Sequence, residues 1–308
     1  MIQLIRQRAV QALRNRPGWR NRFERLLEDA RPEPSIFLGY PLDSRPRYGH
    51  GLPPHPELYE IIDRNRDSYR ARLESFSTFK DGLLNIPFNA PENSIEPTWN
   101  NAWLPRLDAL ALYGFVASCA PARFIEVGSG NSTKFARRAI TDCKLNTRII
   151  SIDPKPRAEV DSICDEVVRK PLEAVDLSVF EQLESGDVLF VDCSHTVYMN
   201  SDATVFFLEV LPRLKAGVFV QIHDIFLPYD YPISWGKNYY AEQYLLAAHI
   251  MSENRMFDIL LPNYFIIVDP ELGGGLFPQW DHLKVQSPAL DNWGGSFWLR
   301  TKHRPAPS

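Results

Sequence analysis

The chain has 308 residues, of which 44% are hydrophobic and 23% charged, and its formal net charge is −4. This length suits one large domain or a domain with an appendage, and the apolar content is enough for a full core. The small negative charge gives no general attraction to nucleic acid, and without an apolar run of 18 residues we expect no membrane-spanning helix.

The four cysteines are scattered without CxxC spacing, at Cys119, Cys143, Cys164 and Cys193. This pattern argues against a zinc knuckle or a disulfide framework. It favours a reducing compartment, so we expect a cytoplasmic protein.

The first residues are basic. Six arginines and no acid precede Glu24, and Ile2, Ile5 and Ala9 fall near helical spacing. The start lacks the continuous apolar segment and the small-residue cleavage site of a secretory signal. We predict a basic amphipathic helix that either packs on its own protein or makes a peripheral contact with an anionic membrane or a partner.

A proline-rich stretch follows. Residues 31–59 contain seven prolines among many aromatic and aliphatic residues, which predicts an ordered, irregular segment rather than a free linker. Apolar spacing predicts helices over 56–76 and 104–120. We therefore expect a helical, proline-rich N-terminal cap region at 1–103 and a second domain at 104–308.

From Arg123 onward, short apolar runs alternate with helical patterns. Strands are predicted at 123–127, 148–153, 167–170, 187–192, 218–224, 257–269 and 296–302. Helices are predicted between them at 132–141, 158–166, 176–183, 201–214 and 238–254. Such alternation implies right-handed crossovers and a parallel sheet covered by helices on both faces, which defines an α/β fold.

The first of these strands leads into a glycine-containing loop with the sequence EVGSGNST, which begins at Glu126. In an open α/β sheet this first loop usually cradles the ligand, and Gly128 and Gly130 allow a sharp turn and a close approach. No Gly-Lys-Ser/Thr follows, and Thr133 replaces the third glycine of the dinucleotide pattern. Glu126 fits poorly beside a diphosphate and better suits a ligand with a cationic amine.

The next strand ends in Asp153, about twenty residues after the loop. An acid at that place accepts hydrogen bonds from the hydroxyls of a ribose. An amino-acid tail at Glu126 and the glycine loop, together with a ribose at Asp153, describes S-adenosylmethionine.

At this point the sequence resembles the class I S-adenosylmethionine-dependent methyltransferases, over residues 123–302. The similar motifs are EVGSGNST, SIDP, and DVLFVDCSH followed by AGVFVQIHD. The resemblance implies a Rossmann-like, doubly wound, seven-stranded sheet with an antiparallel last strand at or near one edge. It also implies an adenine site near 170–172. The cofactor-binding residues that we expect are Glu126, Gly128, Ser129, Gly130, Asn131, Ser132, Asp153 and Asp192.

The methyl acceptor should lie past the fourth and fifth strands, where two polar clusters occur. Asp192 and His195 follow the fourth strand, and His223 and Asp224 follow the fifth. The clusters resemble those of metal-assisted small-molecule O-methyltransferases, which implies a divalent ion held by Asp192, His223 and Asp224. An imidazole ligand moves the choice from Mg²⁺ toward Mn²⁺, Fe²⁺, Co²⁺ or Zn²⁺.

A metal-free reading is equally open at this point. In it His195 or His223 is the general base, and Asp224 belongs to the same catalytic group. The plain structural alternative is that these residues only order turns. Aromatic residues between 226 and 240 are expected to wall an acceptor pocket, with Trp103 among the residues of a lid.

The combined interpretation is an O-methyltransferase that acts on a hydroxylated small molecule such as a sugar or a natural product. Three alternatives remain open. The first is a methyltransferase that acts on nitrogen or on a protein side chain, the second is a dinucleotide-dependent oxidoreductase, and the third is a non-catalytic membrane-associated binding protein.

Overall fold

The computed structural model describes residues 42–91, 93–101, 103–156, 158–252, 256–275 and 294–303. The chain divides into two compact units, 1–43 and 44–308, and the described elements all belong to the second. The basic helix predicted for the first residues lies outside the described residues. The division predicted after residue 103 stays a prediction. Within the described ranges, no helix is long and apolar enough to cross a bilayer.

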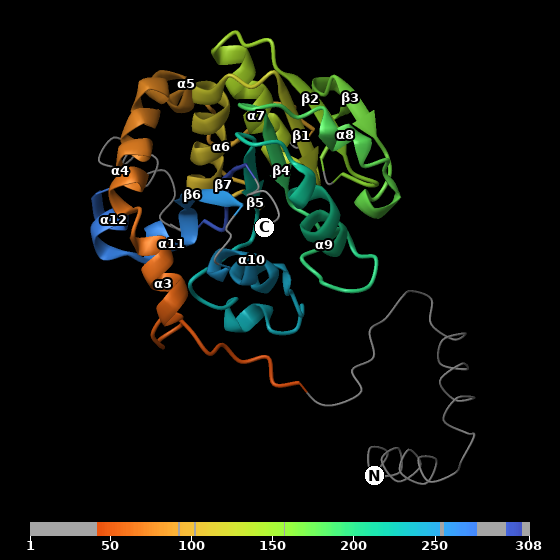
Figure 1. Cartoon of the computed structure of the whole chain (residues 1–308). Helices are drawn as coiled ribbons and strands as arrows, with labels where there is room; N and C mark the ends of the chain where they lie inside the picture. Colours follow the sequence, from red (N-terminus) through yellow and green to blue (C-terminus); the bar gives the residue numbers. More distant parts are fainter. Residues whose placement is uncertain are drawn as a thin grey trace, which may run out of the picture. The chain divides into compact units, whose positions relative to one another are not determined.

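A seven-stranded sheet forms the centre of the second unit, in the order β3-β2-β1-β4-β5-β7-β6 (Figure 1). The strands are β1 Arg123–Val127, β2 Arg148–Ile152, β3 Glu166–Val168, β4 Val188–Val191, β5 Phe219–Ile222, β6 Phe257–Pro262 and β7 Phe297–Thr301. The first five pair in parallel, whereas β7 runs antiparallel between β5 and β6. The predicted α/β class, the strand number and the reversed strand next to one edge are confirmed.

Helices and short helical turns connect the strands. The α-helices are α3 Pro56–Asp63, α4 Arg66–Ser75, α5 Lys80–Leu84, α6 Arg106–Cys119, α7 Asn131–Asp142, α8 Ser178–Glu181, α9 Asp202–Val205, α10 Glu242–Met251, α11 Asn263–Val268 and α12 Pro270–Gly275. The other turns are η1 Phe76–Phe79, η2 Asp161–Ile163, η3 Leu172–Ala174, η4 Phe206–Val210, η5 Leu211–Arg213 and η6 Ile233–Trp235.

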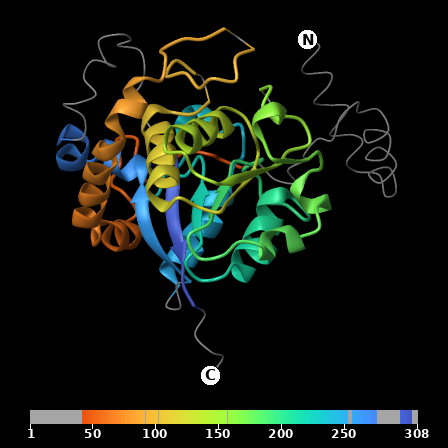
Figure 2. The same cartoon turned by 90° about the horizontal axis from the view of Figure 1, so that it is seen from above.

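The central strands are buried on both faces because helices cover them. All four residues of β4 are buried, as expected for a parallel strand between helical layers. Helices α6 and α7 pack side by side on one face of the sheet (Figure 2). Phe115 of α6 stacks on Trp298 of β7 with ring centroids 4.0 Å apart. These contacts hold fixed the strand ends from which the site residues project.

Helix α7 follows the pattern predicted for it. Phe135, Ala136, Ala139 and Ile140 lie on one face and are buried, and the helix starts directly after the glycine loop. Because this amphipathic face is anchored in the core, the first turn of α7 is held rigidly at the end of β1.

Five predicted elements differ from the structure. The segment 158–166 forms only the turn η2, and Arg137 Nε donates to the Ile163 carbonyl where a helix would have continued. The segment 263–269 is helix α11 rather than strand, since a short apolar run does not distinguish the two. The helix predicted over 201–214 changes from α to π and then to 3-10 geometry.

In the segment 201–214, the last turn contains Pro212, which has no N–H to continue the helical hydrogen bonds. The helix predicted over 56–76 breaks between Asp63 and Arg66 into α3 and α4. The helix predicted from residue 238 begins only at Glu242. The residues predicted to share one side of 56–76 are nevertheless buried, namely Leu58, Ile61, Ile62, Tyr69 and Leu73.

Candidate active site

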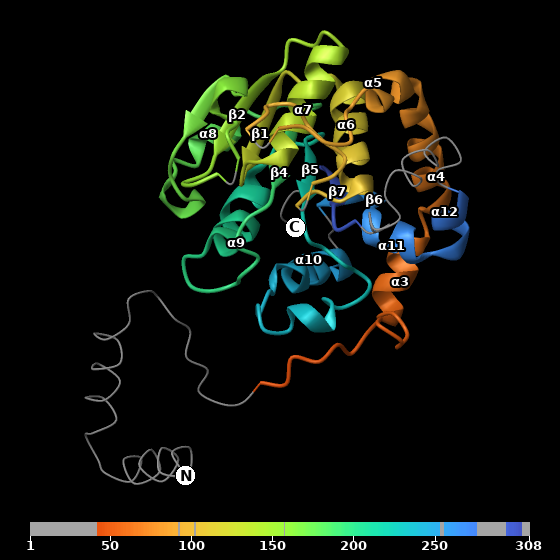
Figure 3. The same cartoon turned by 180° about the vertical axis from the view of Figure 1, so that it is seen from behind.

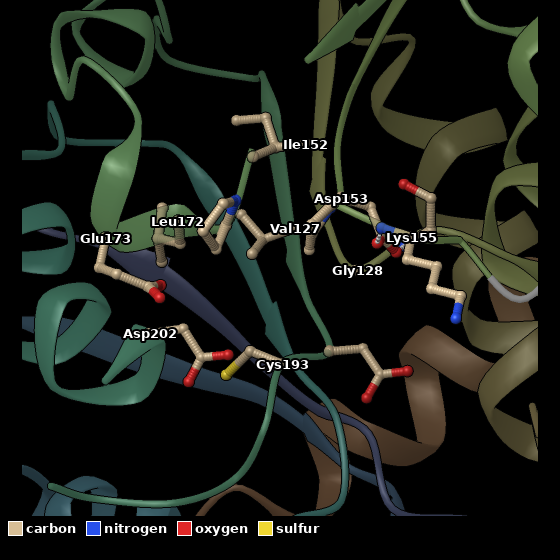
Figure 4. A pocket seen from close by; sticks show the side chains of 13 residues that line it. Val127, Gly128, Ile152, Asp153, Lys155, Leu172, Glu173, Cys193 and Asp202 are labelled. Atoms are coloured by element: carbon tan, nitrogen blue, oxygen red, sulfur yellow. Dashed lines mark hydrogen bonds between the residues drawn. The ribbon is translucent and has the colours of Figure 1, made fainter. Parts of the chain in front are cut away.

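A cavity of about 250 Å³ lies at the carboxyl ends of β1, β2 and β4 (Figure 4). Its wall includes Gly128, Ser129, Asp153, Leu172 and Asp192. In Figure 4 the Glu173 and Asp202 side chains lie on one side of the cavity and those of Asp153 and Lys155 on the other. The structure thus brings together the glycine loop, the acid after β2 and the segment after β3, as predicted for a nucleoside site.

Gly128 is the position in the loop that only glycine fits. Its φ is +81°, and an added Cβ would lie 1.8 Å from the carbonyl oxygen of Asp192. Gly130 differs, because a Cβ there would meet nothing within 4 Å. The constraint at Gly128 therefore comes from the neighbouring strand, whereas Gly130 borders open space.

Asp153 braces the loop as well as the cavity. One carboxylate oxygen accepts the Ser129 N–H at 2.8 Å, and the other accepts the Lys155 N–H at 2.7 Å. Each oxygen keeps a second lone pair for a ligand hydroxyl. The Ser129 side chain is fixed from below by a 2.7 Å hydrogen bond with Ser151.

Glu126 of β1 lines neither of the two cavities described here. It is fully buried, accepts a hydrogen bond from the Thr133 hydroxyl with one oxygen, and leaves Oε1 without a partner. Thr133 Oγ1 in turn accepts the Gly130 N–H at 3.0 Å. Burial raises the pKa of Glu126 to about 8, against the lowering effect of the Ser132 and Thr133 hydroxyls.

A second cavity of about 390 Å³ adjoins the first and shares Ser129 and Asp192 with it. Gly130, Asn131 and Ser132 at the start of α7 line this second cavity. Trp103 and Asn93 of the N-terminal region line it as well. The loop residues predicted to hold an amino-acid tail thus border one space, whose lining includes Trp103, a residue of the predicted lid.

A compact carboxylate–histidine cluster lies at the ends of β4 and β5. His223 Nδ1 is 3.2 Å from an Asp224 oxygen and 3.7 Å from an Asp192 oxygen. His195 Nε2 is 3.4 Å from the same Asp192 oxygen and 3.2 Å from the other Asp224 oxygen. The structure therefore brings together the four residues predicted from the sequence, with both histidines facing the carboxylates of Asp192 and Asp224.

Each histidine also has a buried carboxylate behind it. The His195 Nδ1 atom is hydrogen-bonded to Glu242 at the start of α10, and His223 Nε2 lies 3.3 Å from Asp108 of α6. Glu242 is 1% exposed and Asp108 0%. Asp108 is itself held by Asn263 Nδ2 at 2.6 Å and by the backbone N–H of Gly295 at 2.7 Å.

These carboxylates govern the charge of both imidazoles. Burial alone lowers the pKa of His195, but Glu242, Asp224 and Asp192 outweigh it and raise the pKa to about 9. Burial also lowers the pKa of His223. Asp224, Asp192 and Asp108 outweigh this effect and raise its pKa well above the usual value. The carboxylates therefore favour the protonated form of both rings.

Two of the cluster residues have an unusual backbone. His195 has φ +60° and Asp224 has φ +55°, in the left-handed region that residues with a Cβ seldom adopt. Such conformations cost about 1–3 kcal/mol each and persist where the surrounding structure imposes them.

The cluster has the composition of a divalent-metal site. Asp192, His223 and Asp224 each offer one ligand atom, and these atoms lie within 4.8 Å of one another. Neither nitrogen of buried His223 makes a well-aligned hydrogen bond. Two carboxylates and an imidazole without a hydrogen bond fit an ion such as Mn²⁺ or Zn²⁺.

Sequence reasoning missed Asp108 and Glu242. The signal for Asp108 was a lone acid within the apolar run RLDALALYGFVASC, whose middle is buried all round. Glu242 resembled an ordinary acid in the first turn of a helix. Only the fold shows that both side chains turn inward to the histidines.

Residues 125–225 match the family model described as a methyltransferase domain. Together with the strand order, this match gives the second unit a Rossmann-like methyltransferase fold. An uncharacterized protein of Archaeoglobus fulgidus is 30% identical over 133 residues, which are 41% of this chain and 59% of that protein. The chain therefore spans less than two thirds of this relative.

Two solved structures are among those to which the chain is similar. A methyltransferase from Podospora anserina bound to S-adenosylhomocysteine is 17% identical, with a TM-score of 0.40, covering 83% of this chain and 100% of that one. The O-methyltransferase TomG from Streptomyces achromogenes, in complex with S-adenosylmethionine, is 13% identical, with a TM-score of 0.37. That alignment covers 74% of this chain and 89% of that one.

Proposed function

We propose that the protein transfers a methyl group from S-adenosylmethionine to a hydroxyl oxygen of a small molecule, a sugar or a natural product. The observation that carries the proposal is the meeting of Asp192, His195, His223 and Asp224 next to the cavity bordered by the glycine loop. Asp192 belongs to both places, since it lines the two cavities and faces both histidines.

In the proposed reaction the acceptor oxygen attacks the methyl carbon as the bond from carbon to sulfur breaks. The hydroxyl proton passes to Nε2 of the neutral His195 ring, and the sulfonium becomes the neutral thioether of S-adenosylhomocysteine. The chain's contribution is to align the two partners and to accept this proton. Cofactor-binding roles are assigned to Gly128, Ser129, Gly130, Asp153 and Asp192, whose atoms border the cavities.

Asp192, His223 and Asp224 are the residues that would hold a divalent ion. The chemistry that such an ion supplies is a lowered pKa of a bound hydroxyl. Positive charge near Asp192 and Asp224 also opposes the effect that keeps His195 protonated, and so favours the neutral imidazole that a base requires.

The aromatic segment between β5 and α10 supports a small cyclic acceptor. The Tyr240 ring lies 4.8 Å from the His195 ring, and Tyr240 in turn packs against Trp235 and Tyr231. Aromatic side chains beside a base can stack on an aryl or sugar ring. This arrangement fits a cyclic small molecule better than a protein side chain.

Two measurements test this proposal. The first compares thermal shifts with S-adenosylhomocysteine and with NAD, and we expect stabilisation by the former only. The second incubates the protein with methyl-labelled S-adenosylmethionine, Mn²⁺ and a panel of hydroxylated aromatics and sugars, with and without a chelator. Labelled O-methyl product that the chelator suppresses supports the metal-assisted reading. Stabilisation by NAD alone would instead support a dinucleotide-dependent enzyme.

A further inference from the structure

The N-terminus of α10 holds His195 at three points. The His195 carbonyl oxygen accepts the Ala241 N–H at 2.8 Å and the Glu242 N–H at 3.3 Å, and the side chain of Glu242 bonds to Nδ1 of the same residue. One residue, Glu242, thus contacts both the backbone and the ring of His195. This helix lies 47 residues further along the chain and beyond the ends of β4 and β5 (Figures 1 and 3).

The contacts with Glu242 determine the direction in which each nitrogen of the His195 ring points. With Nδ1 engaged by Glu242, the opposite nitrogen Nε2 is directed at Asp192 and Asp224. The left-handed backbone of His195, at φ +60°, is the conformation that the two carbonyl hydrogen bonds maintain. Tyr240 closes one side of the ring, so its freedom to turn is small.

Glu242 has little structural reason to be a buried acid. It is 1% exposed, and apart from His195 its carboxylate is reached by the Cys193 thiol at 3.6 Å, a weak donor. Burying a carboxylate costs free energy unless a partner compensates, and a helix start can be stabilised by an exposed acid instead. The compensating partner here is the His195 ring.

We propose that Glu242 is the positioning residue of the site: its carboxylate fixes the ring of His195 so that Nε2, and not Nδ1, faces the acceptor. This inference rests on the proposed function, because it assigns Nε2 the task of receiving the acceptor proton. Histidines that act through one nitrogen are commonly oriented by a bond to the other.

The test compares Glu242→Ala with Glu242→Gln in the full chain. Gln keeps an oxygen that can accept the Nδ1 hydrogen, whereas Ala removes it. The spectroscopic readout is the far-downfield proton resonance of the hydrogen-bonded Nδ1–H, assigned by its absence in His195→Asn. We expect the resonance in the wild type and in Glu242→Gln, and its loss in Glu242→Ala.

The kinetic readout uses the acceptor found by the panel above. Glu242→Ala should lower kcat by about tenfold to a hundredfold, the usual effect of losing such an orienting partner, with the KM for S-adenosylmethionine unchanged. Glu242→Gln should recover most of the lost kcat. A merely structural role would instead lower the melting temperature of both variants and leave kcat of the folded protein equal.

Calorimetric binding of S-adenosylhomocysteine separates the two claims. If neither the wild type nor the variants bind S-adenosylhomocysteine, the proposed function is wrong. If the wild type binds it, and Glu242→Ala keeps either the downfield resonance or a kcat within twofold of the wild type, the positioning role of Glu242 is wrong.

Discussion

The carbonyl oxygen of Asp192 lies 1.8 Å from the place that a Cβ on Gly128 would occupy. Gly128→Ala must therefore push the glycine loop away from β4, besides straining a φ of +81°. We expect a loss of about 1–3 kcal/mol of unfolding free energy from the strain alone, and weak binding of S-adenosylhomocysteine. Chemical denaturation and calorimetry measure the two effects.

Gly130→Ala is the matched control for this change. Its φ of 172° lies outside the left-handed region, and an added Cβ meets nothing within 4 Å. The variant therefore lacks the collision with the Asp192 carbonyl and should lose less stability than Gly128→Ala. If Gly128→Ala proves as stable as Gly130→Ala, the close approach of the loop to β4 does not exist in solution.

Asp153→Ala should raise the dissociation constant for S-adenosylhomocysteine at least about tenfold, because two ribose hydrogen bonds of about 1 kcal/mol each are lost. The change also removes the acceptor of the Ser129 N–H, so the loop itself loses support. Asp153→Asn, which keeps one acceptor oxygen, should show a smaller loss. An unchanged binding isotherm for Asp153→Ala would remove this residue from the cofactor site.

Asp224→Ala should separate metal binding from cofactor binding. Because Asp224 faces both histidines and lines neither described cavity, Mn²⁺ affinity and methyl transfer should fall at least about a hundredfold while S-adenosylhomocysteine still binds. Electron paramagnetic resonance of Mn²⁺ and calorimetry give the two numbers. Asp258→Ala, at a half-exposed carboxylate of β6, is the control expected to change neither. Retained Mn²⁺ binding in Asp224→Ala would contradict the ligand assignment.

Glu126→Gln should change how stability depends on pH. The folded-state pKa of Glu126, about 8, lies above the value for an exposed carboxyl, so the folded protein binds more protons than the unfolded chain between those values. Stability from this group is therefore fully present at low pH and is lost as the pH rises. The glutamine variant, which cannot titrate, should gain stability over the wild type by on the order of 3 kcal/mol between about pH 5 and pH 8.

Urea unfolding of both proteins at several pH values measures this difference. Glu209→Gln, at an exposed carboxylate, should show no such trend. A constant difference between Glu126→Gln and the wild type across the range would mean that Glu126 is ionised in the folded protein.

Much of this arrangement could be predicted from the sequence, for identifiable physical reasons. Short apolar runs, such as the one that stops before Asp153, predicted the strands and placed the acids that follow β2 and β4 at one edge of the sheet. Because parallel strands end together, Asp192 and Asp224 were expected near each other without any knowledge of their contacts.

The features that escaped depend on packing over long sequence separations. Nothing near residue 108 or 242 in the chain reveals that Asp108 and Glu242 turn toward histidines more than 45 residues away. The apolar run after Pro262 fits a buried strand as well as it fits a helix. In the structure it forms α11, with Phe265 and Ile266 buried. Periodicity alone does not decide such a segment.

The central claim is that the cavity between the glycine loop and Asp153 binds S-adenosylmethionine through its amino-acid tail and its ribose. A crystal structure of the protein soaked with S-adenosylhomocysteine tests this most directly. We expect density with the ribose hydroxyls on the Asp153 carboxylate, the tail along Gly128 to Ser132 and the sulfur toward Asp192. Density for the ligand elsewhere, or a cavity that stays empty at saturating ligand, would contradict the account.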